Sequence, residues 1–155
     1  MIRKAQQKDI PRITELLLQV EMVHHAIRPD IFKWRVSKYS SEELLHIFAD
    51  ESTPVFVAVD EKDRVAGYAF CRITEYKNHP LLVNRKTVYI DDLCVDETQR
   101  GTGIGSALYD YVKTYAKEIG AHSVTLNVWE GNEKAKDFYR KKGLKVQRYY
   151  LEENL

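Results

Sequence analysis

The sequence predicts a single α/β domain, residues 1–155, in which helices pack against a mixed β-sheet. Two observations lead to this prediction. Short apolar runs rich in β-branched and aromatic residues alternate with longer runs in which apolar residues recur at helical spacing. The expected order of elements is β-α-α-β-β-β-α-β-α-β, and the length suits one domain with its own core.

The first third of the chain is expected to form a short strand and two helices. Residues 1–4 are predicted as the strand and residues 8–22 as the first helix, which Asp9 would cap. Residues 24–39 show no regular pattern. In residues 40–43 two serines precede two glutamates, which is typical of a capped helix start, so a second helix is expected to end near residue 50.

Three strands are predicted in the middle of the chain. Residues 55–59 and 65–73 are apolar and β-rich, and the polar residues 61–63 between them indicate a hairpin. Residues 87–95 form the next apolar run, which is also expected to be a strand.

The C-terminal part is expected to alternate helices and strands. An apolar stripe predicts a long helix over residues 104–119, and residues 124–128 alternate like a strand. A short helix follows and is expected to end at Gly143. Residues 145–155 are predicted as a last strand region.

The composition excludes several classes of function. The 24 basic and 23 acidic residues nearly balance, so neither nucleic acid nor a membrane surface is an expected partner. The chain has no apolar run as long as a membrane span and no signal-peptide pattern. Cys71 and Cys94 lie in apolar runs without metal-ligand spacing, so we expect two buried thiols, no metal site and a cytoplasmic location.

The strongest functional signal is the segment Arg-Gly-Thr-Gly-Ile-Gly at residues 100–105, between a predicted strand and a predicted helix. The first N–H groups of a helix lack internal partners and carry the positive end of the helix dipole. Glycines let a pyrophosphate approach those groups without a Cβ in the way. The segment therefore predicts a site for a phosphorylated cofactor.

Two common nucleotide motifs do not fit this segment. A nucleotide P-loop needs a lysine directly after its glycines, and none is present. A dinucleotide-binding motif has the spacing Gly-x-Gly-x-x-Gly near the first strand, whereas the spacing here is Gly-x-Gly-x-Gly, late in the chain.

A third motif fits. Arg100-x-x-Gly103-x-Gly105 resembles the pyrophosphate-binding motif Arg/Gln-x-x-Gly-x-Gly/Ala of the GNAT superfamily of N-acetyltransferases. Residues 89–95 resemble the central strand of that family. Asn132, followed by Tyr139 and then Gly143, resembles its last helix.

The resemblance implies a GNAT acyl-CoA N-acyltransferase fold, with a central mixed sheet splayed at the acetyl-CoA strand and about four flanking helices. It implies acetyl-CoA as donor and a primary amine as acceptor, joined by direct attack. The residues that it implies for cofactor binding are Leu93, Cys94, Val95, Arg100, Gly101, Thr102, Gly103, Ile104, Gly105, Ser106, Asn132 and Tyr139.

Tyr139 and Asn132 are expected near the reacting thioester. A phenol has a pKa near 10 and a coenzyme thiol about 8.5, so Tyr139 can donate a proton as charge develops on the sulfur. Asn132 resembles the residue that hydrogen-bonds the pantetheine arm, and it also suits a helix N-cap.

Asp91 and Asp92 are the candidates for the base that deprotonates the amine. Adjacent strand residues face opposite sides, so only one is expected to face the cleft. Residues 89–92 resemble the Tyr-Leu-Glu-Asp stretch of the diamine acetyltransferases, whose glutamate attracts the polyamine. The resemblance implies Asp91 as the first candidate, acting directly or through a water molecule. The alternative is a carboxylate at a strand bulge with no role in the reaction.

The acceptor is less well defined by the sequence. The resemblance places the first two helices and their connection around the acceptor, so His24, His25, Phe32 and Asp92 are candidate substrate contacts. N-terminal acetyltransferases of ribosomal proteins carry a glutamate where Asn127 stands here, which favours other acceptors.

A small-molecule amine, in keeping with the diamine resemblance, is therefore the first expectation. A protein N-terminus or lysine is an alternative acceptor, and an acyl-CoA-binding sensor without catalysis is a further alternative. The apolar residues Tyr149, Tyr150 and Leu151 suggest a homodimer edge.

Overall fold

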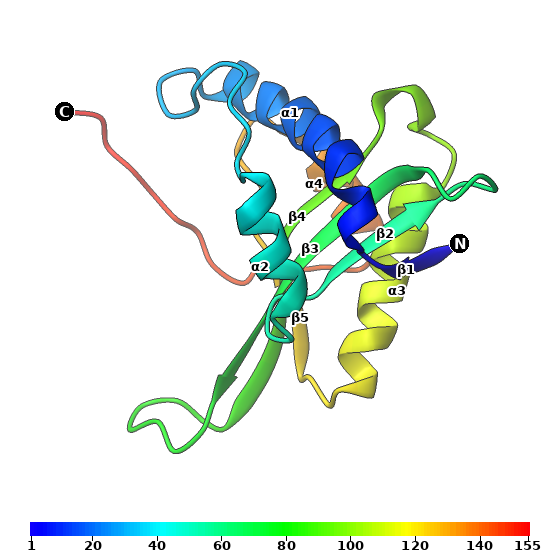
Figure 1. The fold of residues 1–155 in the computed structure, drawn as a ribbon. Coiled ribbons are helices and arrows are strands. Elements are labelled where there is room, and N and C mark those ends of the chain that lie inside the picture. The colour runs from blue at the N-terminus through cyan, green and yellow to red at the C-terminus, as the bar shows by residue number, and fades with distance from the viewer.

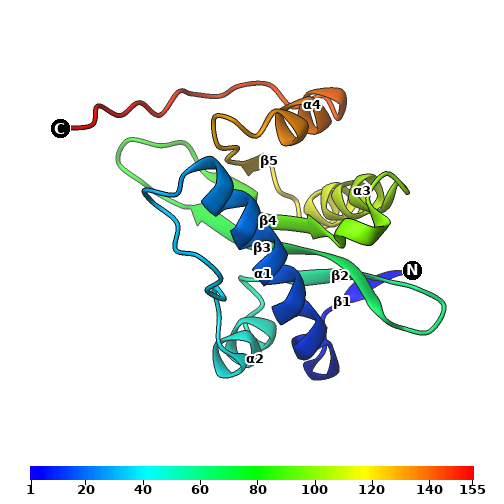
Figure 2. The same ribbon diagram turned by 90° about the horizontal axis from the view of Figure 1, so that it is seen from above.

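A five-stranded mixed sheet with helices on both faces makes up the computed structural model, which describes residues 1–155. The strands are β1 (Ile2–Lys4), β2 (Val55–Val59), β3 (Val65–Tyr76), β4 (Arg85–Val95) and β5 (Ser123–Leu126). The helices are α1 (Ile10–Ile27), α2 (Ser41–Ala49), α3 (Ile104–Glu118) and α4 (Glu133–Lys141), with short 3-10 turns at Gln7–Asp9 and Glu97–Gln99. Helices α1 and α2 cover one face of the sheet, and α3 and α4 cover the other (Figures 1 and 2).

The strands lie in the order β1-β2-β3-β4-β5, and only β4 and β5 run parallel. This mixed sheet with its four α-helices confirms the predicted fold class. β4 pairs with β3 along its whole length, whereas its pairing with β5 covers only residues 87–90. Residues 91–95 of β4 therefore have an open edge, which is the splay implied by the resemblance.

Each face of the sheet has its own apolar core. The cluster under α1 and α2 includes Leu16, Leu17, Leu44, Tyr68, Phe70 and Cys94. The cluster under α3 includes Ala69, Cys71, Val88, Ile90, Leu108 and Val112. Because residues 68–71 alternate between the two clusters, β3 is buried on both faces. Cys71 and Cys94 are free and buried, as expected, and burial raises the pKa of each thiol to about 12.

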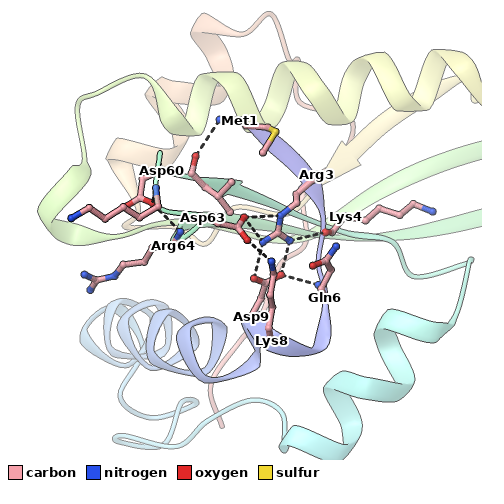
Figure 3. Close-up of polar contacts among 11 residues, drawn as sticks. Met1, Arg3, Lys4, Gln6, Lys8, Asp9, Asp60, Asp63 and Arg64 are labelled. Carbon is pink, nitrogen blue, oxygen red and sulfur yellow. Dashed lines mark hydrogen bonds and ion pairs between the residues drawn. The ribbon is translucent and has the colours of Figure 1, made fainter.

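Charged side chains hold β1 to the turn between β2 and β3 (Figure 3). Arg3 donates to both carboxylate oxygens of Asp9, at 2.7 and 2.9 Å, and to Asp63 at 2.9 Å, and Lys8 also pairs with Asp63. The carboxylate of Asp9 accepts a further bond from the N–H of Gln6 at 2.8 Å. The expected capping of α1 by Asp9 is therefore wrong: Asp9 lies at the helix start, but its oxygens bind these groups instead.

Helix α1 is longer than the expected residues 8–22. The helix continues through His24 and His25, and the N–H of Arg28 still bonds the carbonyl of His24 at 2.9 Å. Pro29 then stops it, because a residue before proline disfavours the helical conformation. His24 and His25 therefore lie on the last turn of α1 and not in an irregular segment.

The predicted start of α2 is confirmed. The Ser40 hydroxyl accepts from the N–H of Glu43 at 3.1 Å, and the Glu43 carboxylate accepts from the N–H of Ser40 at 2.8 Å. None of the helices is long and apolar enough to cross a membrane.

The predicted last strand over residues 145–155 is wrong. After α4 the chain continues as an extended arm that leaves the body of the molecule (Figures 1 and 2). No backbone hydrogen bond joins this arm to the rest of the chain, and Tyr150 is 97% exposed. A side-chain contact remains, between Arg28 and Glu152. The composition of the arm suits a strand, but a strand forms only where a neighbouring strand supplies hydrogen bonds.

Candidate active site

The glycine turn at residues 100–105 is open toward solvent in front of α3. Gly101 and Gly103 have φ angles of 81° and 88°, which favour glycine, and Gly103 stands just before the first residue of the helix. A Cβ at either glycine would meet no atom within 4 Å. No side chain caps α3. The turn thus presents a helix start with free space in front of it, as an anion site requires.

Buried polar contacts fix the loop that precedes this turn. Asp96 is 5% exposed and pairs with Arg12 of α1. The side chain of Gln19 accepts from the N–H of Glu97 at 3.1 Å. Burial alone would raise the pKa of Asp96, but the N–H of Thr98 and the charge of Arg12 outweigh it and lower the pKa. Helix α1 therefore positions the glycine turn, a connection that the sequence analysis missed.

Close packing also sets the relation between β3, β4 and α3. A Cβ on Gly67 of β3 would lie 2.8 Å from the carbonyl oxygen of Cys94, so only glycine fits there. A Cβ on Gly105 would meet Val95 and Leu93 at 3.5 and 3.9 Å, which is ordinary contact. This tolerance agrees with a motif that accepts glycine or alanine at the position of Gly105.

A β-bulge in β4 brings Asp91 and Asp92 to the same face of the sheet. Phe70 of β3 pairs with Asp92 and Cys71 pairs with Ile90, so Asp91 has no partner residue. The Asp92 carboxylate bonds a residue of the core under α1 and α2, and Asp91 bonds the segment that leads into α2. The expectation that only one of these carboxylates faces the cleft is therefore wrong, because the extra residue breaks the alternation of the strand.

Asp92 is half-buried beside the core under α1 and α2. Its carboxylate accepts from the hydroxyl of Tyr68 at 2.8 Å. Burial raises the pKa of Asp92 to about 6, while the Tyr68 bond and the charge of Lys38 act in the opposite direction. Asp91 and Glu21 of α1 add negative charge nearby and raise it further. Asp92 therefore changes its charge close to neutral pH, the range in which a general base works best.

Asp91 is also half-buried and lines a small cavity. Its carboxylate accepts from the ammonium of Lys38 at 2.6 Å and from the hydroxyl of Tyr39 at 3.4 Å. The cavity measures about 240 Å³, and its lining residues are Tyr39, Ile47, Thr53, Phe70, Cys71, Arg72 and Asp91. Tyr39 stacks on Phe70 with ring centroids 5.7 Å apart. Neither Lys38 nor Tyr39 was identified from the sequence as a contact of Asp91.

Tyr139 packs on the opposite side of the sheet from Asp91, against the cluster under α3. Its ring contacts Phe138 and Tyr109, with centroids 5.0 and 6.2 Å away. Burial raises the pKa of Tyr139, and the charge of Asp92 raises it further. The phenol is therefore protonated at neutral pH. The negative charge of Asp92 is thus close enough to act on the Tyr139 hydroxyl.

Asn132 caps helix α4, and its side chain accepts from the N–H of Ala135 at 3.2 Å. Asn127 donates to the hydroxyl of Tyr89 at 3.1 Å. The second contact joins the paired part of β4 to the chain that follows β5.

His24 and His25 of α1 and Phe32 of the segment that follows it form an aromatic wall. The ring of His24 lies 5.0 Å from Phe32, and Phe32 meets Trp129 edge-on at 5.2 Å. His25 contacts the carbonyl oxygen of Phe32 through Nδ1 at 2.7 Å. Burial lowers the pKa of His24. The structure thus brings His24, His25 and Phe32 together, and adds Trp129, which the sequence analysis did not single out. No group of three or more His, Cys, Asp or Glu side chains is arranged to hold a metal ion.

A family comparison identifies this arrangement. The model of the acetyltransferase (GNAT) family matches residues 20–144, which is most of the chain. The chain belongs to the GNAT family. The resemblance based on residues 89–105 and on the Asn132 to Gly143 segment is thereby confirmed.

Curated relatives of this GNAT protein have several different amine acceptors in their names. Peptidyl-lysine N-acetyltransferase YjaB of Escherichia coli K12 is 33% identical over 105 residues, which are 68% of this chain and 58% of that protein. Tyramine N-feruloyltransferase 4/11 of Nicotiana tabacum is 35% identical over 89 residues, which are 56% of this chain and 38% of that protein. The chain thus spans little more than half the length of YjaB.

Solved structures match over the whole chain. A mutant of the BH1408 protein of Bacillus halodurans has a TM-score of 0.95 at 33% identity, covering 100% of this chain and 99% of that one. An aminoglycoside acetyltransferase from an uncultured soil metagenomic sample has a TM-score of 0.76 at 24% identity, and the match covers 100% of this chain and 95% of that one. The first match includes the extended C-terminal arm, while the second concerns the fold alone.

Proposed function

We propose that this protein moves the acetyl group of acetyl-CoA to the primary amine of a small cationic molecule, by direct attack in a ternary complex. The observation that carries the proposal is the β4 bulge. It sets two carboxylates on one face of the sheet, directly beside the open strand edge of residues 91–95. Carboxylates in that position attract a cationic amine and can take its proton.

The residues at the glycine turn suit coenzyme A. The free space before Gly101 and Gly103 admits a pyrophosphate, and Arg100 contributes positive charge. The open edge at residues 93–95 offers backbone groups to the amides of a pantetheine arm. Ser106, in the first turn of α3, completes this side of the binding site. When bound, acetyl-CoA supplies an acetyl group activated as a thioester.

We assign the proton acceptor to Asp92 and keep Asp91 as the group that binds the cation. Asp92 is within electrostatic reach of Tyr139, the proposed proton donor, whereas Asp91 lines the cavity and pairs with Lys38 and Tyr39. With a pKa of about 6, Asp92 is mostly ionised at neutral pH and can accept a proton from the amine.

Tyr139 is the proposed proton donor to the leaving sulfur. Its raised pKa keeps the phenol protonated and makes it a weaker acid than a free tyrosine. Proton transfer is therefore expected only when negative charge has developed on the sulfur. The attacking nitrogen forms its bond to the carbonyl carbon, the carbon–sulfur bond breaks, and the sulfur receives this proton.

Size and charge favour a small acceptor. The cavity of about 240 Å³ is smaller than a site for a drug-sized ligand, and Asp91 stands at its edge. The names of three similar proteins contain the acceptors peptidyl-lysine, tyramine and an aminoglycoside, each of which carries an amine. Two of these three acceptors, tyramine and the aminoglycoside, are small molecules.

A thiol-release assay tests the proposal. The full chain is incubated with acetyl-CoA and a panel of amines that includes diamines, aromatic amines, an aminoglycoside and a lysine peptide. We expect thiol release with small diamines. Tyr139→Phe should lower kcat by at least tenfold while the calorimetric Kd for acetyl-CoA changes less than about twofold. Binding of acetyl-CoA without turnover of any amine would instead identify an acyl-CoA-binding sensor.

Peptide lysine is the second candidate acceptor, because YjaB is 33% identical over 105 residues. The same panel decides between the two. If the lysine peptide has a higher kcat/KM than every small amine, the acceptor is a protein. A protein N-terminus is tested by a peptide without lysine.

We also propose a homodimer in a reducing, cytoplasmic compartment, where two unpaired thiols are the usual state. On the extended arm, Leu151 is 86% exposed to solvent and Tyr150 is 97% exposed. Strand β5 lies at the end of the sheet and has a free edge. An arm of this length can pair with a strand edge of a second copy. Light scattering tests this: the full chain should have twice the mass of a chain ending at Leu144, and a monomeric full chain contradicts the proposal.

A further inference from the structure

Lys38 occupies the place where a cationic acceptor would bind. Its ammonium lies 2.6 Å from the carboxylate of Asp91 and 5.3 Å from the centroid of the Tyr39 ring. A carboxylate beside an aromatic face is a general recognition site for an ammonium ion. The protein thus fills its own cation site with a side chain from the segment between α1 and α2.

We propose that Lys38 is a tethered counter-ion, which a cationic acceptor must displace from Asp91 before it can occupy the cavity. This inference rests on the proposed function, because it assigns the acceptor class and the resident competitor of the same site. The acceptor class is a short diamine: one amine reacts, and the second ammonium replaces Lys38 at Asp91.

The surroundings of Lys38 allow this exchange. Its side chain is 35% exposed and comes from an irregular connection, so it can turn into solvent without moving a helix or strand. Asp91 is less exposed, at 20% for its side chain, and belongs to the central strand. The anion is therefore held by the sheet while the cation is free of any helix or strand, which is the arrangement that an exchangeable counter-ion needs.

The charge balance of the site also favours an acceptor with two positive charges over an acceptor with one. Asp91 and Glu21 both add negative charge near Asp92, and Lys38 is the cation that offsets Asp91 and Asp92. When Lys38 turns away, the site has excess negative charge, which a dication offsets better than a monoamine. Lys38 therefore selects for acceptors with a second positive group.

The test compares Lys38→Met with Lys33→Met, a matched change in the same connection at an exposed lysine. Calorimetry without acetyl-CoA measures the Kd of 1,4-diaminobutane and of n-butylamine on the full chain. We expect Lys38→Met to tighten diamine binding about fivefold, the size of one lost surface ion pair, and to change butylamine binding less than twofold. Lys33→Met should leave both values as in the wild type, and Lys38→Arg should restore the wild-type values.

Two outcomes overturn the inference. If Lys38→Met leaves diamine affinity unchanged, Lys38 does not compete with the ligand. If Lys38→Met and Lys38→Gln weaken diamine and monoamine alike, Lys38 supports the site and is not displaced. Because the readout is binding, a wild-type protein that acetylates no amine would refute the proposed function and still leave this test decisive.

Discussion

The two halves of β4 differ in almost every physical property, although they belong to one strand. Residues 87–90 are paired on both sides, and Val88 and Ile90 are buried in the core under α3. Residues 92–95 are paired with β3 alone, Asp91 has no partner, and the segment carries two carboxylates. A single extra residue, at the bulge, separates the half that stabilises the fold from the half that forms the site. This division predicts that stability and activity can be changed separately along one strand.

The largest expected effect comes from Asp92→Asn in the second half. The variant keeps the size of the side chain and an acceptor for Tyr68 but removes the proposed base. We expect kcat to fall about 10²- to 10³-fold, which is the usual contribution of a general base. Steady-state thiol release measures it. A kcat within threefold of the wild type would mean that Asp92 is not the base.

The same variant should also be more stable at neutral pH. The folded protein raises the pKa of Asp92 from 3.8 to about 6, so ionisation opposes folding and stability falls as pH rises through that window. Removing the charge should therefore raise the free energy of unfolding by ~3 kcal/mol at pH 7. Urea unfolding measures it, and no gain between pH 5 and 8 would contradict the assigned pKa.

Ile90→Ala in the first half should have the opposite effect. The side chain is 3% exposed, so its truncation leaves a cavity and is expected to cost about 3 kcal/mol of stability. The kcat per folded molecule should remain within about twofold of the wild type, because Ile90 faces away from the carboxylates. Urea unfolding measures the first quantity, and the rate of thiol release per acetyl-CoA-binding site, counted by calorimetry, measures the second. A loss of kcat as large as that of Asp92→Asn would break the division between the halves.

The pH dependence of kcat/KM in the wild-type protein is a smaller effect than those of the two substitutions. The base must be ionised, so kcat/KM should be constant from about pH 7 to 8 and should fall about tenfold per unit below the Asp92 pKa of about 6. A pH–rate profile with a short diamine, whose amines stay protonated from pH 5 to 8, checks this. The acid limb should be absent in Asp92→Asn. An unchanged limb in that variant would assign it to another group.

The smallest effects are expected at the glycine turn. Gly103→Ala places a Cβ at a φ of 88°, and the strain should cost ~1 kcal/mol and weaken acetyl-CoA binding several-fold. Gly105→Ala is the matched control, since its Cβ meets neighbours at 3.5 Å or more, and stability should change by less than ~1 kcal/mol. Thermal unfolding and calorimetry with acetyl-CoA compare the two. Equal effects would mean that backbone conformation does not determine this site.

Sequence reasoning succeeded where the signal is local. The glycine turn, the capping of α2 by Ser40 and Glu43, and the buried cysteines each depend on neighbours in the chain or on apolar pattern. The end of α1 was also local, yet it was placed too early because the stop at Pro29 was not used. Local chemistry thus predicted most elements of the fold.

The rest of the site depends on long-range contacts. Lys38 and Asp91 are 53 residues apart, and Arg12 and Asp96 are 84 apart, so no spacing rule connects them. The bulge was missed because the rule of alternation assumes that every strand residue has a partner. The arm at residues 145–155 was predicted as a strand from composition, but composition does not supply a neighbouring strand.

The bulge has a consequence for how such a site can evolve. Ile90, Asp92, Leu93 and Cys94 would alternate regularly between the two cores if Asp91 were absent, since the pairing with β3 skips only that residue. Asp91 is thus an extra residue that leaves the alternation between the two cores unchanged. A single codon gained or lost at this point would add or remove a binding group for the acceptor, and the fold would not have to be redesigned. The choice of acceptor can therefore diverge quickly among related proteins that keep one architecture.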